Sequence, residues 1–282
     1  MQITNKGNLP QVLVDAVAND PYDPGEKTDM SVTTLLQPAR KVALTKEHGH
    51  ELVEDAADRM WALMGSAIHV VLEQAGEAPN RIIERRFYGD FDGWKISGQV
   101  DVIEDDVMSD YKFMSVWEII YGLKEEKIAQ LNMLRLLARN EGVEVNSIQI
   151  VAMLRDWQMI KSKTDANYPQ HHIMTVPVPV WDDKTVTEAI LSRIQAHRDT
   201  EVGLPLCSDE ERWYSGSKYA VMKTGRKSAL RVLGSQEDAE KWMEDNSDKG
   251  GTNIEFRPGE NKRCENYCSV CEKCEQFQSL KG

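Results

Sequence analysis

The stretch from Gly98 to Lys112, GQVDVIEDDVMSDYK, constrains the fold more than any other part of the chain. Apolar and polar residues alternate on both sides of an acidic turn at Glu104-Asp105-Asp106, and this two-residue period predicts a β-hairpin. We expect its strands over Trp94 to Ile103 and Val107 to Phe113. The other elements of the chain then have to be arranged around this strand pair.

Three charged side chains of the hairpin are predicted to share one surface. Asp110 and Lys112 are two residues apart on a strand and therefore point to the same face, and Asp101 on the first strand can lie across from them. Two carboxylates and an ammonium group would repel or pair unproductively unless a divalent cation and a phosphate lie between them. The hairpin thus predicts a metal-dependent phosphodiester-cleaving site, and the alternative is a solvated strand face.

A helix is predicted before the hairpin, because apolar residues recur at helical spacing between Leu52 and Ala75. We expect its stripe in the core: Ala57, Trp61, Met64, Ile68, Val71, Leu72 and Ala75. His69 falls on a neighbouring face, with Gly65 one turn before it and Glu73 one turn after it. Since the hairpin can pack directly on this helix, His69 is a candidate ligand as well as an ordinary hydrogen-bonded histidine.

Further elements follow from apolar periodicity and from capping residues. Ser31 can cap a short helix that Pro38 would end, and the basic residues Arg40, Lys41 and Lys46 are expected in a solvated loop. The remaining predictions are strands at Arg81–Phe87, Ser147–Leu154 and His172–Val180, and helices at Val32–Leu36, Val116–Asn140 and Lys184–His197. Gln130 lies in the apolar stripe of the long helix, where it has to find hydrogen-bond partners. The strand Ser147–Leu154 is continuously apolar and is expected to be covered on both faces.

Length and composition favour one large domain with an appendage. The chain has 282 residues, and we predict a loosely ordered leader over residues 1–27, a core over 28–204 and an appendage over 205–282. A formal charge of −12 argues against a protein that coats nucleic acid through a general positive field, although a local basic groove remains compatible with it. No apolar run has the length of a membrane span and no signal-peptide pattern is present, so a cytoplasmic protein is expected.

The appendage contains a basic segment between Trp213 and Gln236. No acidic residue interrupts it, and Trp213, Tyr214 and Tyr219 are interleaved. It is the best candidate for a DNA phosphate-contacting surface, through Lys218, Lys223, Arg226, Lys227 and Arg231. The same residues also fit an ordinary basic hairpin around Gly225, followed by a helix at Glu237–Glu244 and a strand at Asn253–Phe256.

Four cysteines lie close together near the end of the chain, in RCENYCSVCEKCEQF: Cys264, Cys268, Cys271 and Cys274. This spacing is closer than that of a usual zinc ribbon and is more typical of an iron–sulfur ligand run. We therefore expect a [4Fe–4S] cluster, with Zn²⁺ or free thiols as the alternatives. Lys262 and Arg263 are expected to lower the thiol pKa values.

Taken together, His69, Asp101, Asp110-Tyr111-Lys112 and Gln130 resemble the RecB-like branch of the PD-(D/E)xK nucleases, with phage-type exonucleases and CRISPR-associated RecB-like exonucleases as the nearest relatives. The resemblance runs from SVTTLLQPAR through GSAIHVVLE, GQVDV, SDYK and QLNML to the C-terminal cysteines. It implies an α/β, restriction-endonuclease-like fold, in which helices flank a mixed central sheet, in a bacterial or phage-infected cell.

The resemblance also implies roles for single residues. Metal ligands would be His69, Asp101, Asp110 and the Tyr111 carbonyl, with Mg²⁺ or Mn²⁺ as the cofactor. Lys112 would orient the attacking water and stabilise the developing charge, and Gln130 would position Lys112 or a substrate phosphate. Glu73 is the candidate for a second ion.

Three features depart from the family pattern. Leu134 stands where the family's Q-x-x-x-Y motif has Tyr, and Gln37 stands near the place where cluster-bearing members often have a cysteine. Cys264, Cys268 and Cys274 match the family's C-terminal triplet. This leaves Cys271 as the expected fourth ligand, with Cys207 in reserve.

The expected function is a metal-dependent deoxyribonuclease, most simply an exonuclease that processes DNA ends or single strands in recombination or replication. By analogy, a single-strand annealing protein would be its partner. One alternative is a catalytically silent nuclease-fold protein that binds DNA or a recombination partner. Another is an iron–sulfur redox protein.

Overall fold

The computed structural model describes residues 2–19, 28–76 and 78–281. The chain forms two compact units, of which the first contains Met1–Ala43 and Gly49–Leu204 and the second contains Leu44–His48 and Pro205–Gly282. Within the described residues, no helix is both long and apolar enough to cross a bilayer.

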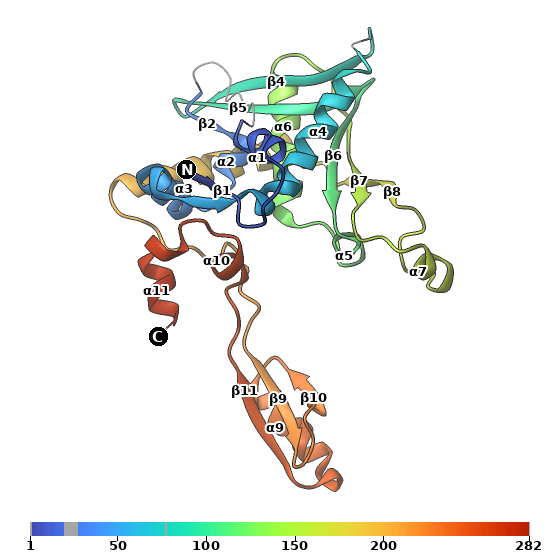
Figure 1. Cartoon of the computed structure of the whole chain (residues 1–282), viewed down its shortest axis with the longest axis vertical. Helices are drawn as coiled ribbons and strands as arrows, with labels where there is room; N and C mark the ends of the chain where they lie inside the picture. The colour runs from blue at the N-terminus through green and yellow to red at the C-terminus, as the bar shows by residue number, and fades with distance from the viewer. Residues whose placement is uncertain (1, 20–27, 77, 282) are drawn as a thin grey trace. The chain divides into compact units, whose positions relative to one another are not determined.

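The first unit is built on a mixed sheet of six strands in its described part, with helices flanking it (Figure 1). The strand order is β2-β5-β6-β7-β8, and β4 pairs with β5. The β2/β5 and β6/β7 pairs are parallel, whereas the β4/β5, β5/β6 and β7/β8 pairs are antiparallel. The strand bounds are β2 Met30–Ser31, β4 Arg81–Phe91, β5 Trp94–Glu104, β6 Val107–Met114, β7 Ser147–Leu154 and β8 Ile173–Val178. The predicted hairpin is confirmed as β5 and β6, and the sheet makes the fold α/β.

The acidic turn of this hairpin has a defined backbone. Asp105 has φ of 54°, a left-handed conformation that Asp tolerates better than most residues. Its N–H donates to the Asn80 carbonyl at 2.7 Å, and the Asn80 amide donates to its carboxylate at 3.0 Å. The turn is therefore tied to the residue that precedes β4.

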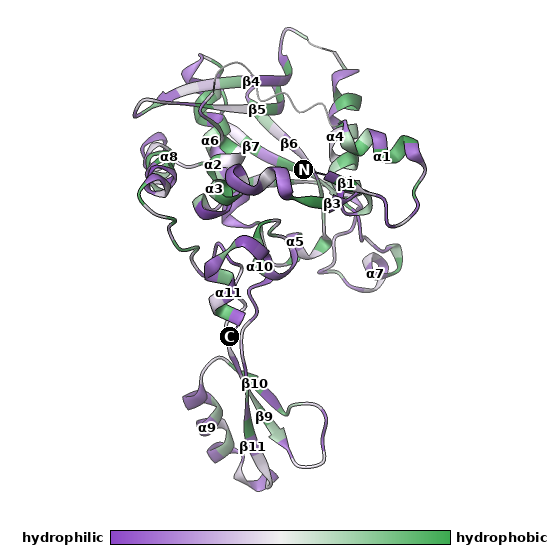
Figure 2. Cartoon of the chain, turned by 60° about the vertical axis from the view of Figure 1, so that its left-hand side comes forward, coloured by the Kyte–Doolittle hydropathy of each residue, from purple (hydrophilic) through white to green (hydrophobic). Residues whose placement is uncertain are grey.

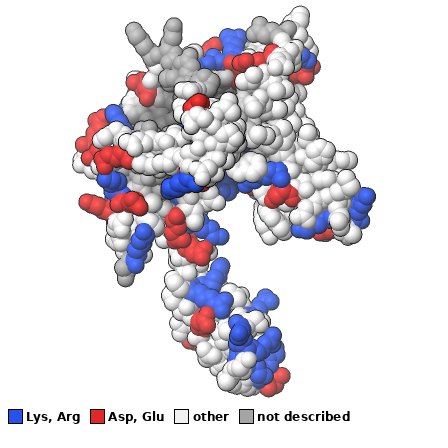
Figure 3. Space-filling model, in the orientation of Figure 1, with Lys and Arg blue, Asp and Glu red and all other residues white. Residues whose placement is uncertain are grey.

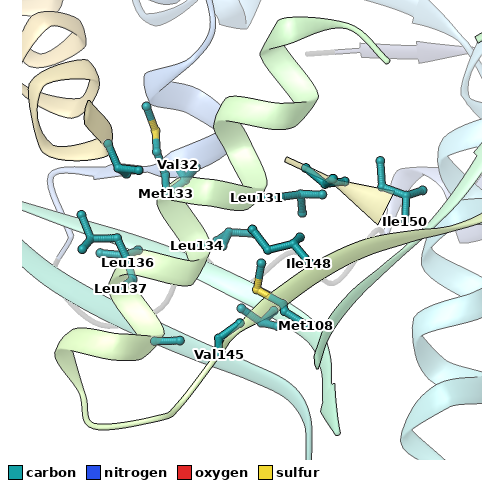
Figure 4. Packing of buried hydrophobic residues seen from close by; sticks show 14 of the residues in the cluster. Val32, Met108, Leu131, Met133, Leu134, Leu136, Leu137, Val145, Ile148 and Ile150 are labelled. Atoms are coloured by element: carbon teal, nitrogen blue, oxygen red, sulfur yellow. The ribbon is translucent and has the colours of Figure 1, made fainter. Parts of the chain in front are cut away.

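The main core packs α6 (Glu125–Asn140) against the sheet, as Figure 4 shows for Leu131, Leu134 and Leu137 beside Met108 and Ile148. Helix α8 (Asp183–Arg198) adds Val186, Ile190 and Ile194 to the same core. Burial in β7 alternates, because Ile148, Ile150, Ala152 and Leu154 are buried and the residues between them are only partly covered or exposed. The expectation of full cover on both faces of this strand is therefore wrong for one face.

Gly98 brings β5 close to α6. A Cβ atom added at Gly98 would lie 2.1 Å from Cδ2 of Leu134 and 3.3 Å from Cγ2 of Val32. Leu134, the residue that stands where the family motif has Tyr, is thus a buried packing residue in this chain. A larger ring at this position would meet the β5 backbone.

Gly98→Ala is expected to destabilise the protein by about 1–3 kcal/mol, because the added methyl group has to displace the buried Leu134. Urea unfolding followed by circular dichroism measures this loss. The double variant Gly98→Ala, Leu134→Ala is expected to lose less stability than the sum of the two single variants, since the smaller side chain removes the clash. If Gly98→Ala alone unfolds at the wild-type urea concentration, this packing description is wrong.

The helix predicted at Val116–Asn140 is two helices, α5 (Val116–Ile120) and α6. Gly122 lies between them with φ of 93°, a conformation that ends a helix. The N-cap of α5 is Ser115, whose hydroxyl accepts from the Trp117 N–H. As predicted, Ser31 caps the short helix α2 (Val32–Leu35).

The expected loose leader is wrong over its described part. Strand β1 (Gln2–Thr4) pairs in parallel with β3 (Val53–Asp55), and α1 (Gln11–Ala18) buries Val14 and Val17 against Ala56. The apolar spacing in QVLVDAVA provides this buried face. The rest of the predicted leader, residues 20–27, lies outside the described residues.

Two further expectations near the N-terminus are corrected: the solvated loop is wrong, and the next helix is present but starts later and is less buried than expected. Arg40, Lys41 and Lys46 lie on a helix, α3 (Ala39–His48), for which Pro38 is the N-cap, and Arg40 is buried and donates to the Leu204 carbonyl at 3.0 Å. The helix predicted at Leu52–Ala75 is α4 (Met60–Glu73), preceded by the 3-10 turns η1 (Gly49–Glu51) and η2 (Ala56–Arg59). No residue of α4 is fully buried in the described structure, and Trp61 is 56% exposed. Figure 2 shows the apolar residues along this helix.

The second unit contains a small antiparallel sheet of order β10-β9-β11. Its strands are β9 Lys218–Lys223, β10 Arg231–Leu233 and β11 Thr252–Arg257, and α9 (Gln236–Asp245) covers them with the buried Ala239. The predicted hairpin around Gly225, the helix and the last strand are confirmed. The cysteine-bearing end contains α10 (Lys262–Asn266), η5 (Cys271–Lys273) and α11 (Glu275–Lys281).

Candidate functional site

Three ligand groups converge beside the central hairpin: His69 from α4, Glu84 from β4 and Asp101 from β5. One ligand atom of each lies within 4.8 Å of the others, a spacing that a single metal ion can bridge. Nδ1 of His69 is 2.8 Å from Oε1 of Glu84 and 3.7 Å from Oδ1 of Asp101. The structure therefore brings together His69 and Asp101 as predicted, and it adds a carboxylate that the sequence analysis missed.

Glu84 reaches this site through an irregular backbone. It has φ of 49° within β4, and the β4/β5 register passes from Ile83↔Val102 to Arg85↔Val100 without pairing Glu84 to Asp101. A left-handed residue inside a strand is strained, and such positions concentrate at functional sites. The Gln99 amide donates to Oε2 of Glu84 at 2.7 Å and fixes the carboxylate in this position. Sequence periodicity gave no signal for Glu84, because its carboxylate reaches the site through this local irregularity of β4.

Asp110 and Lys112 lie on β6 next to this group. Nζ of Lys112 donates a hydrogen bond to Oδ1 of Asp110 at 2.9 Å. The same ammonium group lies 2.8 Å from Oδ2 as an ion pair, but not in the geometry of a hydrogen bond. Oδ2 is consequently a buried oxygen without a hydrogen-bond partner among the described residues. Such an atom is costly unless it binds something further, and a cation shared with Asp101 would satisfy it.

Asp101 connects the two strands of the hairpin. Its Oδ2 accepts the backbone N–H of Tyr111 at 2.7 Å, while its Oδ1 faces His69. The Tyr111 carbonyl is not part of the three-residue group, and its role as a ligand stays a prediction.

The pKa shifts in this group of residues all have the same sign. Burial and the nearby Asp110 carboxylate raise the pKa of Asp101 to about 7, against the opposing effects of Tyr111, His69 and Lys112. The hydrogen bond that the Glu84 carboxylate accepts from His69 raises the pKa of His69 against the effect of burial. Burial alone would lower the pKa of Lys112, but Asp110 outweighs it and raises that pKa. The protonated forms of Asp101, His69 and Lys112 are thus favoured.

The site opens into a cavity of about 500 Å³. Besides the residues above, its wall includes Glu73, Arg86, Gln99, Gln130 and Leu134. Gln130 is half-buried, and its amide donates to the Thr33 hydroxyl at 3.3 Å. Glu73 is exposed at the rim, where its role for a second ion stays a prediction. Arg86, which the sequence analysis did not single out, gives the wall a guanidinium group that suits a phosphate.

In the second unit, hydrogen bonds place Cys207 beside the C-terminal cysteine segment. Its N–H donates to Oε1 of Gln276 and its carbonyl accepts from Nε2 of the same side chain, both at 2.8 Å. Gln276 comes two residues after Cys274, and Arg212 links the Cys207 carbonyl at 3.2 Å to Asn261. The segment before the basic hairpin is therefore fastened to the segment after it.

The thiols of Cys207 and Cys264 are disfavoured as free anions, because their pKa values are raised. Burial raises the pKa of Cys207 to about 12, and Glu211, Cys274, Cys264 and Cys268 add to this rise. Burial also raises the pKa of Cys264, so the expected lowering by Lys262 and Arg263 is wrong for this thiol, and Arg212 is the cation that opposes the rise. Arg263 instead lies over the Trp213 ring at 4.9 Å. No three of the thiols, all of which are described, come as close together as the His69 group does.

The predicted DNA-contacting residues lie on and beside one hairpin of the second unit. Lys218 and Lys223 are on β9, Arg226 and Lys227 follow in the turn, and Arg231 begins β10. Figure 3 shows Lys and Arg side chains gathered on this part of the second unit. The interleaved aromatic residues pack within the unit, since Tyr219 contacts Phe256 and Trp213 contacts Tyr267. The basic side chains, and not these rings, are left for a ligand.

No family model matches the chain, and no curated protein matches it. Among solved structures, the crystal structure of SSO0001 is similar, with 18% sequence identity and a TM-score of 0.45 over 66% of this chain and 84% of that chain.

Proposed function

We propose that this protein is a metal-dependent DNA nuclease with a restriction-endonuclease-like core. One observation carries the proposal: a single cavity is lined by an imidazole and two carboxylates that lie within 4.8 Å of one another, by the Asp110 carboxylate, and by the Lys112 ammonium that pairs with Asp110. Two facts support cation binding there: Oδ2 of Asp110 is buried with no hydrogen-bond partner among the described residues, although the Lys112 ammonium is near it, and the pKa of Asp101 is raised. Phosphodiester hydrolysis needs this combination of a cation site and a fixed ammonium group.

The donor set fits a small divalent ion. Asp101, Asp110 and Glu84 would supply carboxylate oxygens and His69 a nitrogen, a combination that suits Mn²⁺ at least as well as Mg²⁺. When bound, such an ion neutralises the nonbridging phosphate oxygens and increases the acidity of a water molecule.

The remaining groups position the substrate. Lys112 keeps its proton because of Asp110 and can donate to a phosphate oxygen as negative charge develops on it. Gln130 and Arg86 line the same cavity and can hold the neighbouring phosphate. Water can enter the cavity because it is open, so hydrolysis needs no separate nucleophilic side chain.

DNA end-labelled on one strand tests the proposal. Incubation with Mn²⁺ is expected to release short products, and EDTA or Asp110→Ala is expected to prevent their release. Short products from the label end favour an exonuclease, while internal fragments from a circular substrate indicate an endonuclease. DNA that binds but stays intact with Mn²⁺ would favour the catalytically silent DNA-binding protein instead, and a reversible electron couple that is independent of Asp101 would favour the redox protein.

We infer that the second unit holds an iron–sulfur cluster, with Zn²⁺ as the alternative. The pKa of the Cys207 thiol is raised, so its thiolate form needs a cation nearby. The two hydrogen bonds between the Gln276 side chain and the Cys207 backbone place Cys207 beside Cys274. Cys207 interacts with Cys274, Cys264 and Cys268, so these four are the ligand set that we propose, with Cys271 as the alternative to Cys207. A cluster held in this way would close the basic hairpin into a loop at its base.

Cys207→Ser is expected to remove most of the iron and of the absorption near 400 nm from anaerobically purified protein, because one of four ligands is lost. Cys271→Ser is the matched control and is expected to keep both. Iron analysis and visible spectra measure the two variants side by side. Loss of the cluster in Cys271→Ser with retention in Cys207→Ser would reverse the assignment, and stoichiometric zinc in a colourless wild-type sample would rule out the iron cluster.

A further inference from the structure

An exposed pair of stacked aromatic rings lies just beyond the candidate catalytic strand. The ring centroids of Trp117 and Tyr121 are 5.7 Å apart with an interplanar angle of 16°. The two side chains belong to α5 and the residue after it, and they are 48% and 80% exposed. Large exposed aromatic rings often mark a surface that binds a partner or a ligand. Two rings that are already nearly parallel offer a flat surface on which a third ring can stack.

This pair is held rigidly at the end of β6. Oδ2 of Asp156, the second residue after β7, accepts from the Ser115 hydroxyl at 2.6 Å, and Oδ1 accepts from the Val116 N–H at 2.8 Å. The first turn of α5 is thereby fixed to the sheet. Trp117 comes five residues after Lys112, so the two Cα atoms are at most about 17 Å apart. A nucleotide stacked on the pair is within a few nucleotides of the candidate metal site.

Basic side chains accompany the rings. Nζ of Lys161 lies 5.9 Å from the Trp117 ring centroid, and the guanidinium of Arg155 lies 5.2 Å from the ring of Trp61 on α4. Both basic residues are exposed. The nearby acidic groups are engaged elsewhere: Asp156 fixes α5, Glu118 pairs with Lys127, and Asp165 accepts the Asn167 N–H at 2.9 Å. Figure 1 shows α5 and α7 (Met159–Thr164, which contains Lys161) beyond the ends of β6 and β7.

Stacked rings beside cations are the surface that binds single-stranded nucleic acid. Each base has a π face that can stack on an aromatic ring whatever its sequence, and Lys and Arg contact the phosphates between bases. In a duplex the bases are already stacked on one another, so this surface has little to offer them. Helix α7, which carries Lys161, also exposes the apolar side chains Met159 and Ile160.

We propose that Trp117 and Tyr121 stack the unpaired bases of single-stranded DNA, with Lys161 and Arg155 on its phosphates, and so deliver a strand end to the site. This inference rests on the proposed nuclease function and narrows its substrate to single strands or to duplexes with single-stranded ends.

Fluorescence anisotropy with a labelled 20-nucleotide single strand of mixed sequence, in EDTA so that nothing is cleaved, tests the proposal. Trp117→Ala and Tyr121→Ala are each expected to weaken binding roughly 5- to 150-fold, the range measured for loss of one stacked base. Trp117→Phe, which keeps a ring, is expected to lose much less. Lys161→Ala is expected to reduce the slope of log affinity against log salt by roughly 0.7, as for one phosphate contact on a single strand.

Tyr88→Ala is the matched control, because Tyr88 also carries a lysine over its ring, with Nζ of Lys95 at 5.0 Å, but lies on β4. It is expected to bind the single strand like the wild type. A second probe, 2-aminopurine in the single strand, is expected to lose fluorescence on binding to the wild type and to lose less with Trp117→Ala. This loss of fluorescence reports base stacking itself. If the substitution only disturbed the fold, the strands that still bind would be quenched as strongly as on the wild type.

Unchanged single-strand affinity in Trp117→Ala and Tyr121→Ala overturns the proposal. A blunt duplex of the same sequence is measured beside the single strand, and an equal loss of affinity for this duplex overturns the proposal as well. Failure of the nuclease assignment is seen separately, as absence of Mn²⁺-dependent cleavage in the wild type. Single-strand binding in EDTA does not depend on that result.

Discussion

Lys112→Ala is expected to reduce DNA cleavage by about 10²- to 10³-fold, the usual cost of removing one donor that stabilises developing charge. The fold is expected to remain intact, because Lys112 is partly exposed and contacts the sheet mainly through Asp110. Metal binding is also expected to remain, since the imidazole and the carboxylates are untouched. Single-turnover cleavage of end-labelled DNA at saturating Mn²⁺ measures the loss, and calorimetric titration with Mn²⁺ measures the retained binding.

Lys127→Ala is the matched control for this change. Lys127 lies on α6 and pairs with Glu118, one of the groups that raises the pKa of Lys112, and it is not part of the cavity wall described above. Its loss is expected to leave the cleavage rate within about twofold, as for a surface ion pair. If Lys112→Ala cleaves as fast as Lys127→Ala, Lys112 has no part in the chemistry.

The hairpin and its three charged residues could be predicted because a strand has a strict two-residue period. This period fixes which side chains share a face, so Asp101, Asp110 and Lys112 could be grouped from their spacing alone. Glu84 could not be placed in this way. Its carboxylate reaches the site only because the backbone leaves the β region at this residue, and sequence periodicity says nothing of such a local irregularity.

Helix α4 shows a second limit of prediction from sequence periodicity. Its apolar spacing correctly predicted a helix, but burial depends on which elements lie against that helix, and this is decided by the whole topology. Trp61 therefore stays exposed although it belongs to a regular apolar stripe. The α5 and α6 helices were merged in the prediction because Leu123 and Ile128 continue the apolar pattern across Gly122, whose positive φ breaks the helix.

The cysteine segment was interpreted from distance along the chain, and this favoured Cys271 over Cys207. In the folded unit the 56 residues between Cys207 and Cys264 are closed into a loop by the Gln276 and Arg212 contacts, so Cys207 is a spatial neighbour. Closing a longer loop costs little additional entropy, which is why separation in sequence is a weak guide to ligand identity.

Asp101→Asn is expected to abolish Mn²⁺-dependent cleavage and, at the same time, to stabilise the metal-free protein. The asparagine oxygen can still accept the Tyr111 N–H, while a buried charge beside Asp110 is removed. The melting temperature without metal is expected to rise by on the order of a few degrees. Mn²⁺ is expected to raise the melting temperature of the wild type by binding the folded state, and to have little effect on the variant.

The pH dependence of this gain follows from the pKa of Asp101, which is about 7 in the folded protein against an ordinary value of 3.8. Below the ordinary value the carboxyl group is protonated in both the folded and the unfolded state, so Asn and Asp are equivalent. As the pH rises toward 7, the unfolded chain ionises first, and the wild type loses stability that the variant keeps. The difference in melting temperature is therefore expected to grow from pH 4 to pH 7 and then to level off.

Asp90→Asn, at an exposed position on β4, is the control and is expected to show no such trend. A wild type that is more stable than Asp101→Asn at pH 8 without metal would mean that the carboxylates are not held against one another, and the argument for a cation between them would fail.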